Sequence, residues 1–353
     1  MKHTEGKKKN KAGKVLLIIL CSILILALLA VVIVGVFMGR LLNLINRVDG
    51  TESTLSSSAL EEMLNNQPTD ESIYDEAMDP TDITWDTEPE LIDNGPNVIN
   101  ILLIGSDTRI PGVRALSDTM VLCTLNKSQK TLTLTSFMRD MYVQIPGADP
   151  NRINTAYAIG GMDRLNRTLE RNFGVKVDGN FAVEFDSFMD IIDLVGGVTI
   201  NLDKSEAAYM TRVSDPLLNL SRIYVEGENQ LTGSEALFYS RIRYIDSDFG
   251  RTQRQRNVLS AIFDKCKNLS VAQLYKLMEQ VLPMLTTNMD NATILSYAAQ
   301  AAPLLSGLTL QTQRIPVDHS YKGAMIDGMA VLVPDLWMNQ QAMKEILADE
   351  TPE

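Results

Sequence analysis

Residues 97–125 read NVINILLIGSDTRIPGVRALSDTMVLCTL, and this stretch decides the fold. Residues 98–104 form a nearly continuous apolar run that ends at Gly105, and residues 120–125 form a second run. An apolar run of this length with a turn residue at its end is typical of a strand that is buried on both faces of a sheet. Helices must then cover both faces. We therefore predict a protein of the α/β class.

The rest of the chain alternates between further strand and helix patterns. We predict strands at residues 131–135, 180–185, 198–202 and 309–315. We predict helices at residues 162–172, 187–195, 234–239 and 251–267. Two more helical stretches, a turn near Tyr321 and a last helix with Pro334 in its first turn complete the chain. The expected architecture is a central mixed β-sheet with helices on both faces.

The first 38 residues carry the pattern of a membrane anchor. Residues 15–38 contain no charged side chain, and about 20 apolar residues cross a bilayer as a helix. A cleaved signal peptide would have a shorter apolar core of about 7–15 residues, followed by a small-residue cleavage site. Residues 1–14 hold six Lys and one Glu, which places this basic tail in the cytoplasm. We predict a single-pass protein of the cell membrane whose chain after Arg40 is extracellular.

Residues 39–95 have the composition of a stalk. Residues 49–95 carry fourteen Asp and Glu and no Lys or Arg. A segment with low hydrophobicity and high net charge cannot form a core, and its own repulsion keeps it extended. We therefore predict an acidic, disordered extracellular stalk over residues 39–95.

Cysteine and histidine are too sparse for several kinds of chemistry. The cysteines are Cys21, Cys123 and Cys266, and the first lies in the predicted anchor, so at most one pair can form outside it. The histidines are His3 and His319, which argues against a Ser-His-Asp triad and against a Cys/His zinc site. The formal net charge of −12 argues against nucleic-acid binding, which needs a broad basic surface.

One short segment concentrates arginine in this acidic chain. Residues 241–259 read RIRYIDSDFGRTQRQRNVL and contain Arg241, Arg243, Arg251, Arg254 and Arg256. The planar guanidinium suits carboxylate and phosphate oxygens, often through two parallel hydrogen bonds. Gln255 lies one helical turn after Arg251 and shares its face, and Gly250 lets the backbone approach a ligand. The segment predicts an oxyanion site; the alternative is a solvated helix face paired with Asp246 and Asp248.

Carboxylates flank the buried strands at one edge of the predicted sheet. Asp107 follows the first buried strand, and Asp118 precedes the next one. Open sheets bind ligands at strand ends, and Mg²⁺ is often held by one or two carboxylates plus a substrate phosphate. The alternative is that each aspartate caps a turn. Arg139 and Asp140 follow the strand at residues 131–135, either as part of the site or as a structural ion pair.

Together these residues resemble the LytR–CpsA–Psr family of cell-envelope proteins. The matching segments, in the family's order, are NILLIGSDTR (100–109), SDTM (117–120), LTSFMRDMYVQIPG (134–147), RINTAYAIGG (152–161), DIIDLVGGVTINL (190–202) and residues 241–259. Two positions depart from the family pattern. Leu116 stands where the family often has Arg, and we expect Arg114 to supply that charge. Phe137 and Met138 replace the family's Ile-Pro before Arg139, so the loop that carries this arginine is less constrained.

The resemblance implies a Mg²⁺-dependent phosphotransferase of cell-wall biogenesis. Such enzymes move an anionic or capsular glycopolymer, such as teichoic acid, from a polyprenyl-pyrophosphate carrier onto peptidoglycan. Their partners are this lipid-linked glycopolymer, peptidoglycan and membrane lipid. It also implies a catalytic domain over residues 96–267 and a C-terminal extension over 268–353 packed on it. By motif position, Asp107 and Asp118 would bind Mg²⁺ and would be catalytic together with Arg139 and Arg251. The implied pyrophosphate ligands are Arg114, Arg139, Arg241, Arg243, Arg251 and Gln255.

Other functions remain open at this stage. A polyprenyl-pyrophosphate phosphatase needs the same metal and arginines, and a non-catalytic protein that binds lipid-linked glycan needs only part of them. A transcriptional regulator is disfavoured because the predicted topology places the arginines across the membrane from DNA. The general base is also open, with Asp140, Asp246 and Asp248 as candidates. The sequence leaves the polymer and the acceptor hydroxyl undefined.

Overall fold

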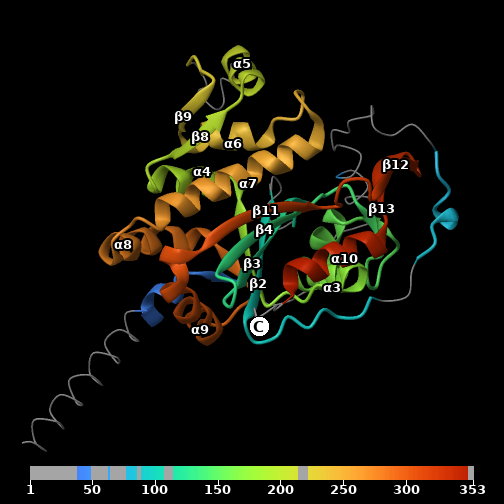
Figure 1. Ribbon diagram of the computed structural model, residues 1–353, viewed down its shortest axis with the longest axis horizontal. Coiled ribbons are helices and arrows are strands. Elements are labelled where there is room, and N and C mark those ends of the chain that lie inside the picture. Colours follow the sequence, from blue (N-terminus) through green and yellow to red (C-terminus); the bar gives the residue numbers. More distant parts are fainter. Residues whose placement is uncertain are drawn as a thin grey trace, which may run out of the picture. The chain divides into compact units, whose positions relative to one another are not determined.

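The computed structural model describes residues 38–48, 63, 77–85, 89–106, 114–213 and 222–348 (Figure 1). The chain divides into two units, Met1–Leu44 and Ile45–Glu353. In the first unit, the described residues 38–42 are helical. No helix within these described ranges is long and apolar enough to cross a bilayer. The predicted anchor at residues 15–38 lies, except for Met38, outside the described residues, so the anchor stays a prediction.

The second unit is built on a seven-stranded sheet with the order β1-β10-β7-β2-β3-β4-β11. Its strands are β1 (Asn46–Arg47), β2 (Val98–Ser106), β3 (Ser117–Asn126), β4 (Thr131–Phe137), β7 (Gly179–Glu184), β10 (Thr286–Thr287) and β11 (Thr309–Ile315). The pairs β2–β3 and β3–β4 are antiparallel, whereas β7 runs parallel to β2 and β11 parallel to β4. The predicted α/β class with a central mixed sheet is confirmed.

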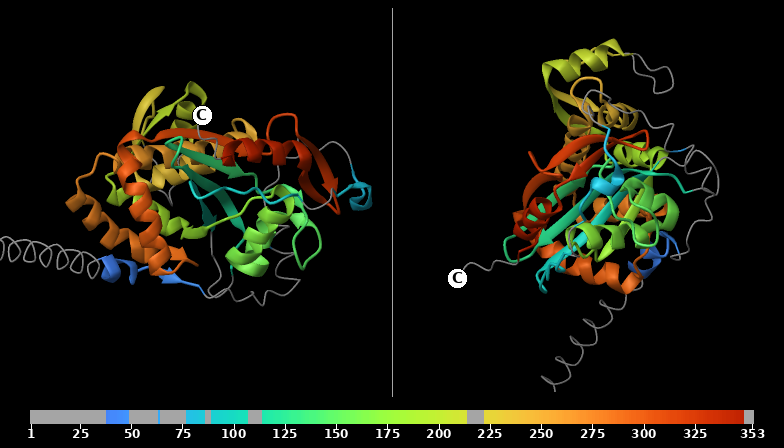
Figure 2. Two further views of the ribbon diagram at one scale, coloured as in Figure 1. Left: turned by 60° about the horizontal axis from the view of Figure 1, so that its bottom comes forward. Right: turned by 90° about the vertical axis from the view of Figure 1, so that its right-hand side faces the viewer.

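One face of the sheet is covered by α3 (Asn154–Phe173) and α10 (Leu336–Leu347), as Figures 1 and 2 show. Leu102 and Leu122 point to this face, because successive strand residues alternate between faces, and both are fully buried. They pack in one core with Leu165 of α3 and Met343 of α10. Burial of such side chains contributes about 1.5–3 kcal/mol each, so this face anchors the fold.

The second face of the sheet is covered less completely. There α4 (Phe185–Leu194) packs against β7, and α7 (Ser247–Cys266) packs against β4 and β11. Ile101 and Leu103 point to this face and are only half-buried, as are their cross-strand neighbours Cys123 and Phe181. Strand β2 is therefore fully buried on one face only, which corrects the prediction of burial on both. The second face offers apolar surface to a ligand.

A lobe with its own core stands beside this face. It contains the hairpin of β8 (Val198–Leu202) and β9 (Gly227–Leu231), together with α5 (Lys204–Arg212) and α6 (Gly233–Arg241). Its core includes Val198, Leu231 and Tyr239 and extends to Val258 of α7. Capping boxes start both α5 and α6, at Asp203 with Glu206 and at Thr232 with Glu235. The core of the lobe holds α6 in place through Tyr239, and the arginine segment starts at the C-terminal end of this helix.

The C-terminal part of the chain belongs to the same domain as residues 96–267, which were predicted to be catalytic. Strand β10 pairs with β7, β11 pairs with β4, and α10 packs in the main core, so the sheet crosses the boundary predicted after residue 267. The remaining elements of this part are α8 (Val271–Val281), η3 (Leu282–Met284), α9 (Asn291–Ala301), η4 (Ala302–Gly307), β12 (Tyr321–Ile326) and β13 (Met329–Pro334). The turn expected near Tyr321 is thus a strand, and Pro334 ends β13 while Asp335 caps α10.

Parts of the predicted stalk are folded onto the domain. β1 joins the sheet. Met78, just before η2 (Pro80–Asp82), donates a backbone hydrogen bond to the carbonyl of Met325. Trp85 stacks on Tyr142 of β5 (Tyr142–Val143), with ring centroids 6.1 Å apart. The prediction of a disordered stalk over residues 39–95 therefore needs correction in its described parts. Isolated apolar side chains such as Trp85 supply contacts that the average composition hides.

Removal of residues 268–353 is expected to abolish cooperative folding. The truncation would leave β4 as an unpaired edge and would uncover the core that α10 buries. Thermal unfolding of residues 45–267, followed by circular dichroism, should show no cooperative transition, whereas removal of residues 349–353 alone should leave it unchanged. A soluble 45–267 fragment with a sharp transition would contradict the single-domain assignment.

Candidate anion-binding site

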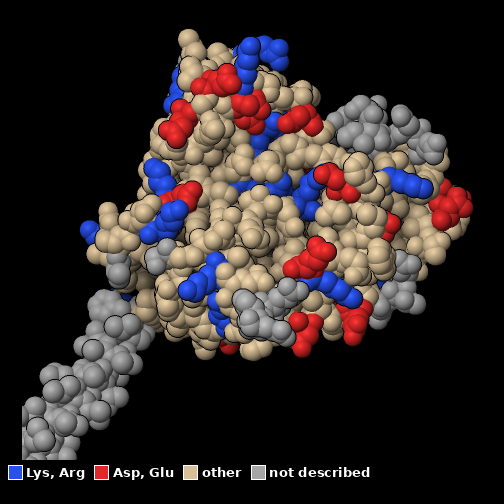
Figure 3. Space-filling view, viewed as in Figure 1, with Lys and Arg blue, Asp and Glu red and all other residues tan. Residues whose placement is uncertain are grey.

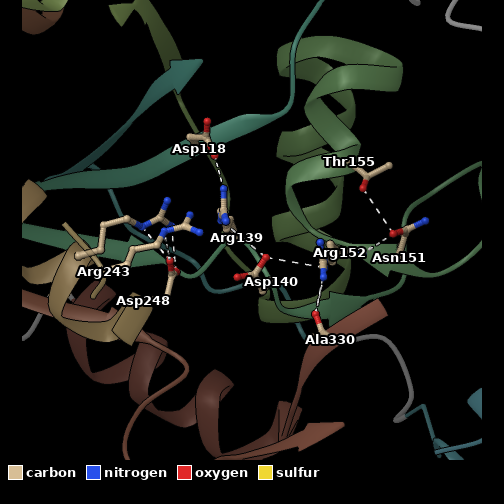
Figure 4. Close-up of polar contacts among 10 residues, drawn as sticks. Asp118, Arg139, Asp140, Asn151, Arg152, Thr155, Arg243, Asp248 and Ala330 are labelled. Carbon is tan, nitrogen blue, oxygen red and sulfur yellow. Dashed lines mark hydrogen bonds and ion pairs between the residues drawn. The ribbon is translucent and has the colours of Figure 1, made fainter. Parts of the chain in front are cut away.

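The site forms where β3 begins and β4 ends. These strands are antiparallel with Val121 opposite Ser136, so Asp118 and Arg139 lie equally far beyond this pair at one edge of the sheet. The Arg139 guanidinium forms an ion pair with the Asp118 carboxylate (Figure 4). Asp107 lies outside the described residues. The described part of β2 ends at Ser106, opposite Ser117.

Asp140 links Arg139 to a second arginine. Its Oδ1 lies 3.6 Å from Nε of Arg139 and 3.7 Å from Nε of Arg152, which belongs to β6 (Asn151–Arg152). Arg152 is fully buried and donates from Nε and Nη2 to the carbonyl of Ala330, at 3.1 and 2.7 Å (Figure 4). Asp140 thus has both of the roles that were predicted as alternatives for the Arg139–Asp140 pair. It forms a structural ion pair that fixes Arg139, and it also borders the site.

Asp248 lies between two arginines of the segment that the sequence singled out. Arg251 binds it with two atoms, Nε to Oδ1 at 2.8 Å and Nη2 to Oδ2 at 2.9 Å. Arg243 approaches the same Oδ1 with its Nε at 3.3 Å. Asp248 and Arg251 are both buried, and Arg243 and Asp248 lie beside Arg139 in Figure 4. The helical spacing of three between Asp248 and Arg251 builds this contact.

The electrostatics join these pairs into one cluster. Burial alone would raise the pKa of Asp248, but Arg251, Arg139 and Arg243 lower it below its ordinary value. Burial works against the charge on Arg139, yet Asp140, Asp248 and Asp118 raise its pKa overall. A carboxylate with a lowered pKa is a weak base, so Asp248 is a poor general base.

Arg243 and Arg251 are held as cations against an electrostatic cost. Burial, followed by repulsion from Arg251 and Arg139, lowers the pKa of Arg243 to about 10. Burial also lowers the pKa of Arg251 despite the attraction of Asp248. Four arginines and three aspartates (Arg139, Arg152, Arg243, Arg251, Asp118, Asp140 and Asp248) make up this described cluster. Its positive excess favours an anionic ligand with several oxygens.

The other arginines of residues 241–259 have different surroundings. Arg254 is buried and binds Glu206 at 2.8 Å, Asp246 at 2.7 Å and the carbonyl of Ile242 at 3.0 Å, so it ties α7 to the lobe. This ion pair also occupies Asp246, one of the candidate bases. Arg256 is buried and donates to Gln253, and burial and the nearby Arg314 lower its pKa to about 10.

The three remaining predicted pyrophosphate ligands have surroundings of their own. Arg241 is exposed at the end of α6, with its guanidinium 5.0 Å from the centroid of the Phe185 ring. Gln255 is half-buried, one turn after Arg251. Arg114 lies over the Tyr157 ring of α3, at 5.7 Å.

Two glycines serve close packing of side chains. Gly161, with φ of +63°, interrupts α3, and a Cβ there would lie only 3.0 Å from the Arg114 guanidinium carbon. The interruption thus makes room for Arg114. At Gly250, a Cβ would lie 2.1 Å from Oδ1 of Asp246. Gly250 therefore accommodates Asp246, which corrects the expectation that it makes space for a ligand.

Sequence reasoning identified most of the cluster but missed two members as site residues. Arg152 stands in the RINTAY segment without an assigned role, and Asp248 was predicted only as a helix-face partner or a base. The spacing of three between Asp248 and Arg251 is the local signal for the latter. Arg152 pairs with Ala330 from the distant β13, and no local pattern reveals that contact.

The carboxylate oxygens of the site also indicate whether a metal ion could bind there. The Asp118 side chain is about a quarter exposed, at 26%, and it supplies the hard oxygen donors that Mg²⁺ prefers. Among the described residues, no group of three or more His, Cys, Asp and Glu is placed to hold a metal ion. A site with one or two carboxylates and a substrate phosphate is compatible with that arrangement.

The fold and the cluster define an α/β protein with buried arginines at the end of a mixed sheet, an arrangement suited to an oxyanion. The LytR_cpsA_psr family model matches residues 56–348. The chain belongs to this family. The family resemblance of the six sequence segments is therefore confirmed, and these segments contain the residues of the cluster.

Curated relatives and solved structures agree with this assignment. The regulatory protein MsrR of Staphylococcus aureus (strain COL) is 30% identical over 271 residues, which cover 73% of this chain and 78% of MsrR. The polyisoprenyl-teichoic acid–peptidoglycan teichoic acid transferase TagV of Bacillus subtilis (strain 168) is 30% identical over 261 residues, 70% of this chain and 60% of TagV.

Two similar structures contain ligands. TagT bound to LI-WTA has a TM-score of 0.59 and 28% identity, with 72% of this chain and 91% of that chain covered. The family protein YwtF (TagT) with bound octaprenyl pyrophosphate lipid has a TM-score of 0.55 and 26% identity, covering 72% and 90%.

Replacement of Arg254 should lower the free energy of unfolding, whereas replacement of Arg243 should not. Arg254→Met strands the buried Glu206 and should lower the free energy of unfolding by about 3–5 kcal/mol. Arg243→Met leaves Asp248 paired with Arg251. Because the folded pKa of Arg243 lies below its ordinary 12.5, its charge costs stability at all pH values below about 10, and the cost fades only between 10 and 12.5.

At neutral pH, Arg243→Met should therefore leave the free energy of unfolding unchanged or raise it. Urea denaturation of both variants beside the wild type measures the difference. An equal loss in Arg243→Met and Arg254→Met would show that Arg243 is structural.

Proposed function

We propose that this protein is a membrane-anchored extracytoplasmic phosphotransferase that moves an anionic or capsular glycopolymer from a polyprenyl-pyrophosphate carrier onto peptidoglycan. The observation that carries the proposal is the cluster of Arg139, Arg243 and Arg251 around Asp248, with Asp118 at its edge. The cluster has the positive excess that a pyrophosphate requires. The names of TagV and the contents of the two TagT structures support the same substrate class.

Two surfaces match the two parts of the proposed donor. The guanidiniums suit the pyrophosphate oxygens, because each can donate two parallel hydrogen bonds to an oxyanion. The half-buried apolar side chains of the second face, including Ile101, Leu103 and Phe181, suit the polyprenyl chain. β2 connects them directly, since Leu103 lies three residues before its end at Ser106.

The proposed transfer is a displacement at the phosphorus that bears the glycopolymer. An acceptor hydroxyl oxygen of peptidoglycan forms the new P–O bond, and the bond to the polyprenyl phosphate oxygen breaks. Polyprenyl phosphate leaves, and the hydroxyl proton passes to a base. Arg139, Arg243 and Arg251 stabilise the charge that develops on the phosphoryl and leaving-group oxygens. Asp140 is better suited as the base, because its contacts with Arg139 and Arg152, at 3.6 and 3.7 Å, are longer than the 2.7 Å contact of Arg254 with Asp246. Asp248 is less suited because its pKa is lowered.

We also propose Mg²⁺ as the cofactor, held by Asp107 and Asp118. Bound there, Mg²⁺ would neutralise charge on the pyrophosphate. Arg139 pairs with Asp118 and so positions its carboxylate at the edge of the cluster. Arg114, Arg241 and Gln255 are proposed as further pyrophosphate ligands that complete the contacts when the donor binds.

A turnover assay with and without acceptor tests the reaction. The wild type should release polyprenyl phosphate and form a glycan–peptidoglycan product only when peptidoglycan is present. Asp118→Ala and Arg251→Ala should each lower the rate on the order of tenfold or more, because each removes charge stabilisation of about 1.5–3 kcal/mol. Chelation of divalent cations should mimic Asp118→Ala. Release of phosphate without acceptor at the full rate would instead identify a polyprenyl-pyrophosphate phosphatase.

Protease accessibility tests the proposed location. The basic residues 1–14 motivate an orientation with the folded domain outside the cell. Protease added to intact cells should therefore digest the chain after residue 40, and a tag on the N-terminus should stay protected. Protection of the whole chain would refute both the topology and the transfer to peptidoglycan.

A further inference from the structure

An exposed aromatic residue lies directly beside the arginine cluster. Tyr244 is 86% exposed, the most exposed of the large apolar or aromatic side chains that the described residues present. It occupies the short loop between α6 and α7, and its chain neighbour is Arg243, which contacts Asp248. Adjacent Cα atoms lie about 3.8 Å apart, so the backbone of Tyr244 lies within the reach of one arginine side chain from Asp248.

The Tyr244 ring is held in a stack of three rings. It stacks on Tyr209 of α5, with centroids 6.4 Å apart and planes inclined by 25°. Tyr209 stacks in turn on Phe238 of α6, at 6.1 Å and 13°. Phe238 and Tyr209 pack against the core of the lobe, so the stack has a fixed base. Tyr244 therefore presents a pre-oriented ring to solvent.

Polar groups flank this stack. The Arg212 guanidinium lies 5.7 Å from the Tyr209 centroid, and Asp246, two residues after Tyr244, has a side chain that is 43% exposed. In Figure 3, Lys and Arg side chains gather on this side of the molecule below the lobe that carries α5. An aromatic stack with a guanidinium over its Tyr209 ring and a carboxylate two residues after Tyr244 matches a sugar ring, which has an apolar C–H face and a rim of hydroxyl groups.

We propose that Tyr244, supported by Tyr209 and Phe238, is a sugar-binding platform that takes one pyranose ring of the glycan next to the phosphate in the arginine cluster. The inference rests on the proposed function and adds a glycan subsite to it. The C–H face of the sugar packs on the Tyr244 ring, and its hydroxyl groups reach Asp246 and Arg212. Because both donor and acceptor carry pyranose rings, the platform serves whichever sugar borders the reacting phosphate.

The test replaces the ring while it spares the cluster. Tyr244→Ala should lower kcat/KM for glycan transfer by roughly tenfold, the scale of one lost aromatic contact. Tyr244→Phe keeps the ring and should retain nearly full kcat/KM. Ile223→Ala, a change at a 79% exposed position of the same lobe outside the stack, is the matched control and should behave as wild type. High exposure of Tyr244 means that the melting temperature should not change.

Two titrations identify the source of the sugar. A rise in KM for a prenyl-pyrophosphate-linked N-acetylhexosamine at saturating acceptor assigns the platform to the donor. A rise in KM for solubilised peptidoglycan strands at saturating donor assigns it to the acceptor. Equal kcat/KM of Tyr244→Ala and wild type in both titrations would overturn the platform.

A binding experiment separates this inference from the proposed function. Calorimetry should show that Tyr244→Ala binds the sugar-linked prenyl pyrophosphate or the peptidoglycan strands about tenfold more weakly, yet binds the same prenyl pyrophosphate without a sugar as wild type does. This difference supports the platform even if the wild type transfers nothing, in which case only the proposed function fails. Equal weakening for the ligand without a sugar would show that Tyr244 acts through the anion site and would overturn the platform.

Discussion

The ion pairs of the buried Asp248 with Arg243 and Arg251 are the interaction on which the site depends. Several like charges cannot be buried together unless a carboxylate offsets them, because desolvation and mutual repulsion both disfavour the cations. Asp248 supplies that offset from the first turn of α7, and its partners come from that helix and from the loop before it. Arg139 joins from the end of β4, held by Asp118 and Asp140. Sheet and helix thus meet at a network of charge pairs that still has a positive excess, and a phosphate ligand can supply the missing negative charge.

The two faces of the sheet divide stability and binding between them. The face under α3 and α10 is fully buried and holds the main core, so it keeps the strand ends in place. The opposite face keeps Ile101, Leu103 and Cys123 only half-buried, and there burial raises the pKa of the Cys123 thiol to about 12, which leaves it an unreactive apolar neighbour. A domain that needed only stability would cover this surface. Its position next to the arginine cluster gives one end of the domain an apolar surface and a cationic surface side by side, as a lipid pyrophosphate requires.

The sequence predicts β2 and β3 well because their apolar runs are long. β11, TLQTQRI, is predicted at its observed bounds although it is mostly polar. The β9 strand, GENQL, was missed because it is short and mostly polar, and it is stabilised by pairing with β8. At the site, helical spacing identifies which arginines share a face but not which partners they meet. Arg251 and Arg254 look alike in sequence, yet Arg254 binds Glu206, which is 48 positions away. Long-range pairing, rather than composition, separates Arg251, the proposed pyrophosphate ligand, from the structural Arg254.

Residues 241–256 show how one segment can carry several functions without conflict. Arg254 contacts the lobe and also pairs with Asp246. The Asp246 side chain lies over Gly250, and any larger residue at position 250 would collide with this side chain. That contact sets how α7 begins, and the beginning of α7 places Asp248 and Arg251 toward the sheet. The same loop carries Tyr244 outward onto the ring stack of the lobe. The lobe therefore holds this segment at two points, Arg254 through Glu206 and Tyr244 through Tyr209, and Arg243 directly precedes the second of them. The geometry of the anion site is in this way coupled to the surface where a glycan would lie.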